Sequence, residues 1–447
     1  MISKGGIPGD YYLELSKTYG GLFRICMWNQ TFVVITEPEL IKDVLVTGNH
    51  PKSKAIYSNL TQMFGARYLG QGLESEIDQK EWIIHRMHFN HWFKPHHLRQ
   101  FTPDYNEFAD SLVQTLEQHA DGKTHVHMEE LFYKVILHLL SKVAYNFDLG
   151  KLDGEPHPFA SNLRVALAGF SKLVVNPFFS MNPLSWKYCQ HVRSAVAKIR
   201  SYAQDQLTER RKANLRGDHV PDDLLQSIYH LKETNPQITE EVLLDQIITF
   251  YTGGSETTAN TLSFMVSLLS RNPDCYKKLQ KEIDDNVAAV AVLTPAELDD
   301  LPYLDMVMKE TLRIYPIGLA TYRKTQHDTS IGGNPIPDGT ELLVSFYATS
   351  RSEKNFTNAL QFIPERFGPN ANERVGVYAS TPFSVGPHSC IGKKIAEIET
   401  KIIIAKIMQH FDFELVPGQP MGVIDGGTLR IAGGCMCLLR PRNEKNN

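Results

Sequence analysis

The chain has 447 residues, of which 42% are hydrophobic, and its 46 lysines and arginines against 50 aspartates and glutamates give a net charge of −4. This balance excludes a disordered or collagen-like chain and gives no overall reason to expect nucleic-acid binding. Six cysteines are too few for a disulfide framework in a chain of this length, which favours a reducing compartment.

The first 50 residues predict a helix, two strands and a second helix. The periods of their apolar residues place a helix over 11–19, strands over 22–28 and 31–35, and a helix over 37–45. A turn at Asn29 and Gln30 is expected to join the two strands. No window of about 18 residues is apolar enough to predict a membrane-spanning helix.

A mostly helical body follows, because apolar residues recur at intervals of three and four from about residue 81 to residue 270. Proline and glycine interrupt this pattern at 153–156, 176–177, 182–183 and 217–218. The last of these helices is expected to run from a Thr239 N-cap to Ser270. Helices continue to about Tyr315.

The C-terminal part changes character and then ends in one strong helix and a β-rich tail. Residues 331–339 and 342–346 predict a small β region, and 362–387 is an irregular, proline-rich stretch. A helix is expected over 391–410, with an apolar stripe on one face, and strands are expected over 411–439. No repeat or low-complexity linker divides the chain, so we expect one α+β domain, mostly α, spanning 1–447.

The most informative segment is a loop that holds Cys390 and opens directly onto the last helix. A helix N-terminus offers free backbone N–H groups and a partial positive charge, which favour a thiolate able to bind a metal. Gly386 allows the loop to turn, Gly392 allows close approach to the backbone, and Phe383 would shield the sulfur from water. The alternative is a buried structural cysteine before a helix.

Two further motifs occur upstream of this loop. Glu310 and Arg313 lie one helical turn apart, and Arg366 follows in a Pro-Glu-Arg-Phe segment. Taken alone, such a pair is most often an ion pair on a solvated face. Residues 253–258 read Gly-Gly-Ser-Glu-Thr-Thr and interrupt an otherwise apolar helix, although two central glycines cost about 1 kcal/mol each. One alternative explanation for these glycines is close helix packing.

Together these motifs, in this order, resemble those of the cytochrome P450 family over essentially the whole chain. The resemblance implies the P450 fold, with haem b held between the long central helix and the cysteine-loop helix. It implies that Cys390 is the axial ligand of the haem iron and that Phe383, Gly386 and Gly392 shape its loop. It also implies that Glu310, Arg313 and Arg366 form a charged network beneath the haem.

The resemblance assigns roles on the other side of the haem as well. Gly253 would leave space for dioxygen, while Thr257 and Glu256 would be the catalytic residues that hydrogen-bond bound oxygen and pass protons to it. The alternative packing role for Gly253 and Gly254 remains open.

Four residues match positions that hydrogen-bond the haem propionates in the family. Trp82 and Arg86 match a WxxxR helix, and Arg323 matches a further propionate arginine. His388 stands two residues before Cys390, where the family usually has arginine. A neutral histidine can donate one hydrogen bond but cannot form a bidentate contact, so haem affinity or potential is expected to differ.

Within the family, the chain looks most like the cholesterol 24-hydroxylases, on the segments 64–75, 366–369 and 413–419. This likeness implies an oxidoreductase that hydroxylates an apolar lipid, with a sterol side chain as the expected substrate. The expected pocket residues, each of which would also suit a core, are Tyr57, Phe64, Leu319, Tyr322 and Thr428. Leu319 stands where those enzymes carry tryptophan, which leaves the identity of the sterol open.

Three alternatives to a sterol hydroxylase remain. A fatty-acid hydroxylase would use an arginine near the pocket mouth, and Arg67 is the candidate. A reductase-independent haem isomerase or dehydratase usually lacks the acid and alcohol that Glu256 and Thr257 provide. A non-catalytic haem protein that binds a gas or a lipid would have no use for them either.

The resemblance also implies partners and a location. Dioxygen and NADPH–cytochrome P450 reductase are the expected co-substrate and electron donor, and Lys94, Arg99, Lys393 and Lys394 would attract an acidic flavoprotein. A monomer on the cytosolic face of the endoplasmic-reticulum membrane is expected, with the usual N-terminal anchor removed or missing from this sequence. A zinc site among His85, His88, His91, His96 and His97 is disfavoured, because residues three apart drift around a helix.

Overall fold

A computed structural model of the protein describes residues 6–27, 30–155, 157–176, 178–371 and 373–442. The helices are α1 (Pro8–Tyr19), α2 (Pro38–Lys42), α3 (Lys54–Thr61), α4 (Gln79–Asn90), α5 (Pro95–Leu98), α6 (Thr102–Glu117), α7 (Met128–Tyr145), α8 (Pro158–Val175), α9 (Trp186–Arg216), α10 (Leu224–Thr234), α11 (Glu240–Arg271), α12 (Pro273–Asn286), α13 (Pro295–Asp299), α14 (Pro302–Ile314), α15 (Phe346–Ser350) and α16 (Lys393–His410). The strands are β1 (Leu22–Met27), β2 (Gln30–Ile35), β3 (Gln62–Met63), β4 (Ala66–Arg67), β5 (Val126–His127), β6 (Ala320–Lys324), β7 (Thr329–Ile331), β8 (Asn334–Ile336), β9 (Glu341–Ser345), β10 (Phe411–Leu415), β11 (Val423–Asp425), β12 (Leu429–Ile431) and β13 (Met436–Pro441).

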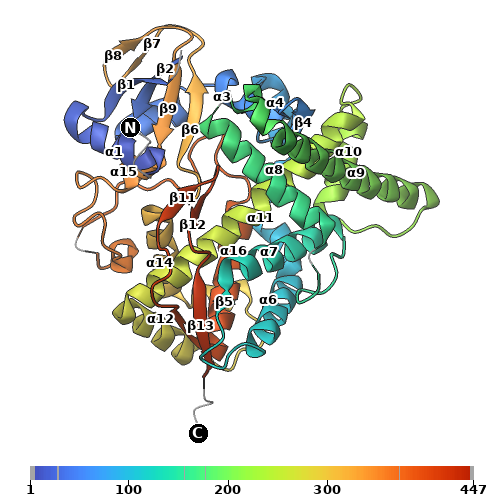
Figure 1. The fold of residues 1–447 in the computed structure, drawn as a ribbon, viewed down its shortest axis with the longest axis vertical. Coiled ribbons are helices and arrows are strands. Elements are labelled where there is room, and N and C mark those ends of the chain that lie inside the picture. The colour runs from blue at the N-terminus through green and yellow to red at the C-terminus, as the bar shows by residue number, and fades with distance from the viewer. Residues whose placement is uncertain (1–5, 28–29, 156, 177, 372, 443–447) are drawn as a thin grey trace.

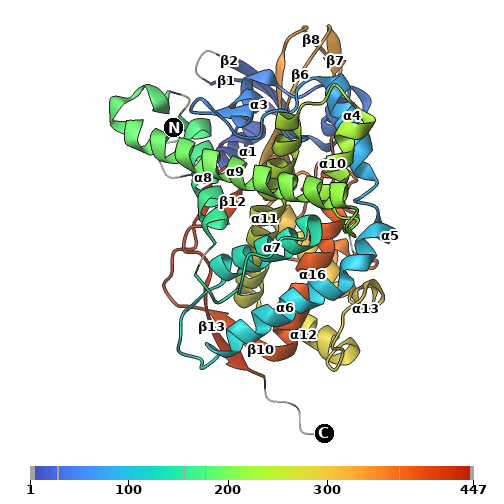
Figure 2. The same ribbon diagram turned by 90° about the vertical axis from the view of Figure 1, so that its right-hand side faces the viewer.

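Helix α11 runs through the middle of the helical body, and α7 packs across it (Figures 1 and 2). Most residues of α11 are buried. Its apolar residues lie on all sides of the helix, so neighbouring elements must surround it to keep them from water. Two glutamates in its first turn and Arg271 in its last turn complement the helix dipole, and Pro273 begins the next helix. The fold is α+β and mostly α, as predicted from the sequence.

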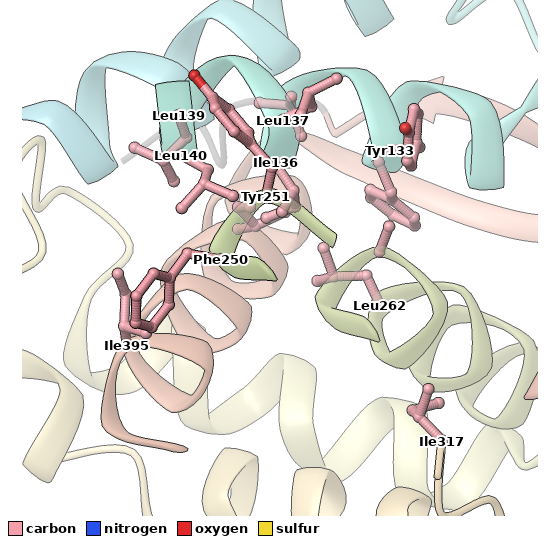
Figure 3. Packing of buried hydrophobic residues seen from close by; sticks show 14 of the residues in the cluster. Tyr133, Ile136, Leu137, Leu139, Leu140, Phe250, Tyr251, Leu262, Ile317 and Ile395 are labelled. Carbon is pink, nitrogen blue, oxygen red and sulfur yellow. The ribbon is translucent and has the colours of Figure 1, made fainter. Parts of the chain in front are cut away.

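Figure 3 shows how α7, α11 and α16 meet in the main core. Leu140 of α7 packs toward α11, and Phe250 of α11 lies beside Ile395 of α16. Phe250 is one turn before Gly253, and Ile395 follows Cys390 by five residues. The apolar contact between α11 and α16 therefore brings the glycine-containing stretch and the cysteine loop to the same part of the molecule.

A four-stranded sheet lies at one end of the body, beside α1 and α15 (Figure 1). Its order is β1-β2-β9-β6, with β2 and β9 parallel and the other neighbours antiparallel. A second sheet, β10-β13-β5, and the β11–β12 hairpin are formed largely by the tail, with β5 contributed from before α7.

Several predicted boundaries are wrong by a few residues. The helix predicted over 37–45 is α2 followed by a π-helical turn over 43–47, and the last helix begins at Lys393 rather than at Ile391. Thr239 does occupy the N-cap position of α11 but makes no side-chain capping hydrogen bond. The end of the strand predicted over 22–28 and the turn at Asn29 fall on residues outside those described.

Among the described residues, every helix is too short or too polar to cross a lipid bilayer.

Candidate active site

The loop before α16 is held in a tight conformation by its own backbone. The Cys390 N–H donates to the Phe383 carbonyl oxygen at 2.8 Å, and the Ser389 N–H donates to the Gly386 carbonyl oxygen at 3.0 Å. Gly386 has φ +77°, and a Cβ there would lie 2.1 Å from the Leu45 carbonyl oxygen. Only glycine fits at this position, because both the backbone conformation and the contact exclude a side chain.

The Cys390 thiol is surrounded by protein yet exposed, so it faces an open space inside the fold rather than packed atoms. Burial raises its pKa to about 11, and a hydrogen bond from the Gly392 backbone opposes the rise. The helix N-terminus predicted to stabilise a thiolate begins three residues later, at Lys393. The protein by itself therefore favours the neutral thiol, and a bound cation would have to supply the charge that stabilises the anion.

The cysteine loop contacts α4 through Arg86. Its guanidinium donates to the Ser389 carbonyl oxygen at 2.6 Å and to the Asn90 side chain at 2.9 Å. Arg323, which is buried in β6, donates to the Thr321 hydroxyl at 2.7 Å. Both arginines keep N–H groups that these bonds leave free for an anion.

His388 stacks on Trp82 of α4, with ring centroids 3.7 Å apart. Both of its ring nitrogens are buried and have no hydrogen-bond partner among the described residues. Burial, together with the nearby charges of Arg323, Lys52 and Arg86, lowers the pKa of His388 to about 2. The imidazole is therefore neutral, and its unpartnered N–H is suited to an anionic acceptor.

A fourth basic residue, Lys52, belongs to the same cluster and was missed in the sequence. It forms an isolated β-bridge with Arg323, and its ammonium donates to the carbonyl oxygens of Leu73 at 2.6 Å and Glu74 at 2.7 Å. The nitrogen lies 5.8 Å from the centre of the Trp82 ring. No motif marks this lysine, because it reaches Arg323 only through strand pairing across about 270 residues.

We expect Lys52 to make the stability of the haem-free protein depend on pH. Burial lowers its pKa to about 7, so above that value the folded protein binds its proton more weakly than the unfolded chain does. The free energy of unfolding should then rise by up to about 4 kcal/mol between pH 7 and pH 10, relative to Lys52→Met. Denaturant titrations at several pH values would measure this difference.

The exposed neighbour Lys54 provides the control, because Lys54→Met should leave the pH dependence unchanged. Equal pH profiles for the wild type and Lys52→Met would contradict the assignment.

The two glycines in the middle of α11 have different surroundings. A Cβ on Gly253 would meet nothing within 4 Å, and Gly253 is exposed although it lies deep within a buried helix. A Cβ on Gly254 would lie 3.0 Å from the Leu140 side chain, which Figure 3 shows on α7. Close packing therefore explains Gly254, while Gly253 borders open space.

Next to this space are the predicted acid and alcohol. The Thr257 hydroxyl donates to the Gly253 carbonyl oxygen at 2.8 Å, within α11. The Glu256 carboxyl is buried, which raises its pKa, and its Oε2 atom has no partner among the described residues. A protonated Glu256 carries a hydrogen that it can donate.

Glu310, Arg313 and Arg366 form one buried network. Arg313 donates to both carboxylate oxygens of Glu310, at 2.6 and 2.8 Å, and Arg366 donates to the Oε1 atom at 3.1 Å. The remaining Arg313 N–H groups bond backbone carbonyl oxygens, among them Ser350 at 2.8 Å and Ala359 at 2.7 Å. The fully buried pair thus differs from the surface ion pair that such spacing usually gives.

Comparison with known proteins decides the family. A sequence model of the family described as cytochrome P450 matches residues 1–437. The chain belongs to the cytochrome P450 family. It is therefore a monooxygenase, an oxidoreductase of the haem-dependent kind.

This P450 is similar to curated P450s of the 3A group. Rabbit (Oryctolagus cuniculus) cytochrome P450 3A6 is 29% identical over 454 residues, covering 93% of this chain and 87% of the relative. Guinea-pig (Cavia porcellus) cytochrome P450 3A14 is 28% identical, covering 90% and 81%. Rat (Rattus norvegicus) cytochrome P450 3A1 is 26% identical, covering 93% and 86%. The predicted likeness to cholesterol 24-hydroxylases is not what these relatives show.

The residues of this P450 fit the haem of its family. The exposed thiol of Cys390 and the open space at Gly253 suit an iron-bound macrocycle, because either feature would be costly in a fully packed core. The donors of Lys52, Arg86, Arg323 and His388 suit the two carboxylates of such a cofactor. Gly392, at the N-cap of α16, leaves the backbone beside the sulfur uncovered.

Three of the residues expected to contact substrate, Tyr322, Tyr57 and Leu319, pack against other parts of the protein. Tyr322 packs its ring against Phe32, with centroids 6.0 Å apart, in the core of the four-stranded sheet. The Tyr57 hydroxyl lies 3.1 Å from the Thr321 hydroxyl. Leu319 is half-buried next to α1.

The other two expected substrate-contacting residues, Phe64 and Thr428, lie in turns and contact helices or an aromatic cluster. Phe64 has φ +50° and joins an aromatic cluster with Phe179 and Tyr188, at 6.0 and 6.5 Å. Thr428, at the tip of the β11–β12 hairpin, accepts a hydrogen bond from Asn260 of α11 at 3.3 Å.

Arg67 is paired with acidic side chains through its Nε and Nη2 atoms. Its guanidinium donates to the buried Asp245 carboxylate at 2.5 Å and lies 3.9 Å from Glu241. Arg200 of α9 also donates to Asp245, at 2.8 Å. The two carboxylates already neutralise the charge of Arg67, which disfavours the carboxylate-binding role expected of it in a fatty-acid hydroxylase.

The predicted partner-facing lysines lie at the surface. Lys393 and Lys394 are half-exposed and pair with Glu397, at 3.8 and 2.9 Å, while Lys94 and Arg99 are exposed. Among the described residues, no group of three or more histidine, cysteine, aspartate or glutamate side chains is arranged to hold a metal ion.

We expect Gly253→Ala to stabilise the haem-free protein and to impair the loaded P450. Alanine adds up to about 1 kcal/mol of helix propensity, but its methyl group enters the open space where a bound gas would lie. Chemical unfolding and carbon monoxide affinity would measure the two effects. Gly254→Ala is the matched control, because its methyl group meets Leu140; equal effects of both variants on gas affinity would contradict this reading.

Proposed function

We propose that this P450 hydroxylates a neutral apolar lipid of sterol size, using dioxygen and electrons from NADPH delivered by NADPH–cytochrome P450 reductase. The observation that carries the monooxygenase chemistry is the exposed Cys390 thiol in its rigid loop, brought by the α11–α16 contact to the part of the fold that holds Gly253. Haem b bound to Cys390 would supply oxygen activation and C–H oxidation. The whole chain, 1–447, would act as one catalytic domain.

The side chains of this protein have separate tasks in the proposed reaction. Lys52, Arg86, Arg323 and His388 hold the cofactor's carboxylates, and Gly253 keeps space free beside α11. Glu256 holds a proton in a buried carboxyl, and the Thr257 hydroxyl is the adjacent group that can pass it on. This acid and alcohol support a monooxygenase over a haem isomerase, a dehydratase or a non-catalytic haem protein.

The ion pairs of Arg67 support a neutral substrate over a fatty acid. A fatty-acid carboxylate would meet an arginine whose charge is already neutralised by Asp245, which is fully buried and accepts hydrogen bonds from two arginines. The expected preference for a sterol side chain rests on the segments that resemble cholesterol 24-hydroxylases and on the apolar side chain of Phe64. Phe64, Tyr57, Leu319, Tyr322 and Thr428 remain the proposed substrate-contacting residues.

Spectroscopy of the purified protein tests this proposal. The reduced, carbon monoxide-bound protein should show the band of thiolate-ligated haem, and sterols should shift the ferric spin state more than fatty acids of equal length do. The variant Arg67→Met tests the alternative of a fatty-acid hydroxylase. If Arg67 only pairs with Asp245, fatty acids should bind this variant as well as they bind the wild type. Tight fatty-acid binding that is lost in Arg67→Met would favour the fatty-acid hydroxylase.

The location is also a proposal. The relation to animal P450s supports a monomer on the cytosolic face of the endoplasmic-reticulum membrane. Lys94, Arg99, Lys393 and Lys394 are the proposed cationic contacts for the reductase, and their effect should appear in the association rate at low salt.

A further inference from the structure

Helix α11 is buried along most of its length except for one short patch. Between Val242 and Leu269, every residue is buried apart from those at positions 252, 253, 254, 256 and 257. Residues four apart on a helix lie on the same side, so Thr252 stands beside Glu256 and next to Gly253. The open space that Gly253 borders therefore also borders Thr252, to which the reaction proposed above gives no role.

The Thr252 hydroxyl is held differently from other hydroxyls of α11. The hydroxyls of Thr257 and Thr261 donate to the carbonyl oxygens four residues before them, at 2.8 and 2.9 Å. In the described part of the chain, the one hydrogen-bond partner of the Thr252 hydroxyl is instead the hydroxyl of Tyr68, with the two oxygens 3.0 Å apart. The Thr252 hydroxyl is thus not used by the backbone of its own helix.

One hydrogen of this hydroxyl pair is left over. Two hydroxyl groups bring two hydrogens, and the bond between them uses one. The Tyr68 side chain is fully buried, so a phenol hydrogen directed anywhere but to Thr252 would be unpaired inside the protein, which is unfavourable. Tyr68 therefore donates to Thr252. The hydrogen of Thr252, which is only half-buried, stays free to donate into the open space beside Gly253.

Tyr68 is held in place by its own backbone and by its neighbour in the chain. Its N–H donates to the Thr61 carbonyl oxygen at 3.0 Å, and its carbonyl oxygen accepts from the Arg200 guanidinium of α9 at 3.4 Å. The preceding residue, Arg67, pairs with the buried Asp245 of α11. These contacts fix the phenol against α11 without help from a ligand.

We infer that the Thr252 hydroxyl donates a hydrogen bond to a neutral oxygen of the substrate, in a ketone or hydroxyl group, and that Tyr68 is a positioning residue for this contact. The inference rests on the proposed function and deepens it, because it assigns one polar group to an otherwise apolar substrate. A neutral oxygen suits an uncharged donor better than a carboxylate does, since Arg67 and Arg200 are paired with Asp245. The contact would also fix which carbon of the substrate lies near the cofactor.

Matched pairs of ketone and hydrocarbon test this contact in the haem-loaded enzyme. The probes are the saturated steroid androstane with its monoketone, and dodecane with its methyl ketone, and ferric spin-state titrations would give their affinities. Thr252→Val removes the hydroxyl but keeps the size of the side chain. It should lower the affinity for both ketones about fivefold and leave the affinity for the hydrocarbons unchanged. Thr252→Ser should keep the ketone affinity, and Tyr68→Phe should lower it by a smaller factor.

The position of hydroxylation provides a second measurement. Reductase-supported turnover of the steroid ketone should give products spread over more carbons in Thr252→Val than in the wild type, and Thr252→Ser should restore the wild-type pattern. The matched control is Thr115→Val in α6, because the Thr115 hydroxyl donates to the Ser111 carbonyl oxygen of its own helix at 2.9 Å. This control should change neither the affinities nor the products.

The outcomes separate this inference from the proposed function. Equal losses of ketone and hydrocarbon affinity in Thr252→Val would overturn the inference and make Thr252 a wall of the pocket. Ketone affinities that are the same in the wild type and Thr252→Val, or a ketone loss that serine does not restore, would overturn it as well. Binding of the straight-chain pair alone would instead contradict a substrate of sterol size, while a selective loss of dodecanone affinity in Thr252→Val would still establish the contact.

Discussion

Replacing Cys390 by serine is expected to abolish the thiolate-type carbon monoxide band and reductase-supported hydroxylation, with a loss of activity of at least about a thousandfold. A serine hydroxyl does not ionise at neutral pH and is a poorer ligand for iron than a thiolate. The loop would keep its shape, because its hydrogen bonds are made by the backbone of residues 383–390. Absorption spectra and product formation with reductase would measure the two losses.

Cys189→Ala provides the control, since Cys189 is buried in α9, far along the chain from the loop. It should reduce stability modestly and leave the carbon monoxide band in place. An unaltered band in Cys390→Ser, or its loss in Cys189→Ala, would contradict the assignment of the iron ligand.

The second large effect is expected in the buried network beneath the site. Glu310→Gln keeps the shape of the side chain but leaves the Arg313 guanidinium buried without a negative partner, and Arg366 loses its carboxylate as well. Breaking a buried ion pair from one side typically costs about 3–5 kcal/mol. The free energy of unfolding should therefore fall by that amount, and much of the protein should fail to retain haem during purification.

An exposed pair of the same spacing gives the comparison. Glu209 and Lys212 are also three residues apart on a helix, at 2.8 Å, but both side chains are more than half exposed. Glu209→Gln should change stability by less than about 0.5 kcal/mol. If both substitutions lowered the free energy of unfolding equally in denaturant titrations, burial would not determine how much stability is lost when an ion pair is broken.

The parts of this molecule that sequence reasoning predicted well depend on local patterns. The apolar stripe of the last helix is largely buried, since Ile402, Ala405 and Met408 are at most 1% exposed. The long central helix was placed within one residue at its C-terminus, because a run of apolar residues ends at Asn272 and Pro273. Such signals need only neighbours within one or two turns.

The parts that sequence reasoning missed depend on pairings between distant segments. Lys52 joins the cluster near Arg323 only after an isolated strand-like bridge forms, and Arg67 finds Asp245 across 178 residues. The contact of Thr428 with Asn260 spans 168 residues. Spacing along a chain cannot reveal these pairs, since the tertiary fold alone decides which side chains meet.

The helix start after Cys390 was missed for a different reason. Ile391 and Gly392 continue the apolar and small-residue pattern into the loop, so periodicity places the boundary two residues too early. Cys390 therefore lies two residues before the N-cap of α16, Gly392, and not at the helix end itself.

The contact between Gly386 and the Leu45 carbonyl oxygen means that the cysteine loop leans on a segment near the N-terminus. That segment is a π-helical turn, a wound stretch with one extra residue per turn, and Val385 packs into the small core around it. A deletion or substitution that rewinds residues 43–47 would thus shift the support of the cysteine loop, whose Cys390 lies more than 340 positions away along the chain. Changes to this N-terminal turn would therefore also disturb the loop that holds Cys390.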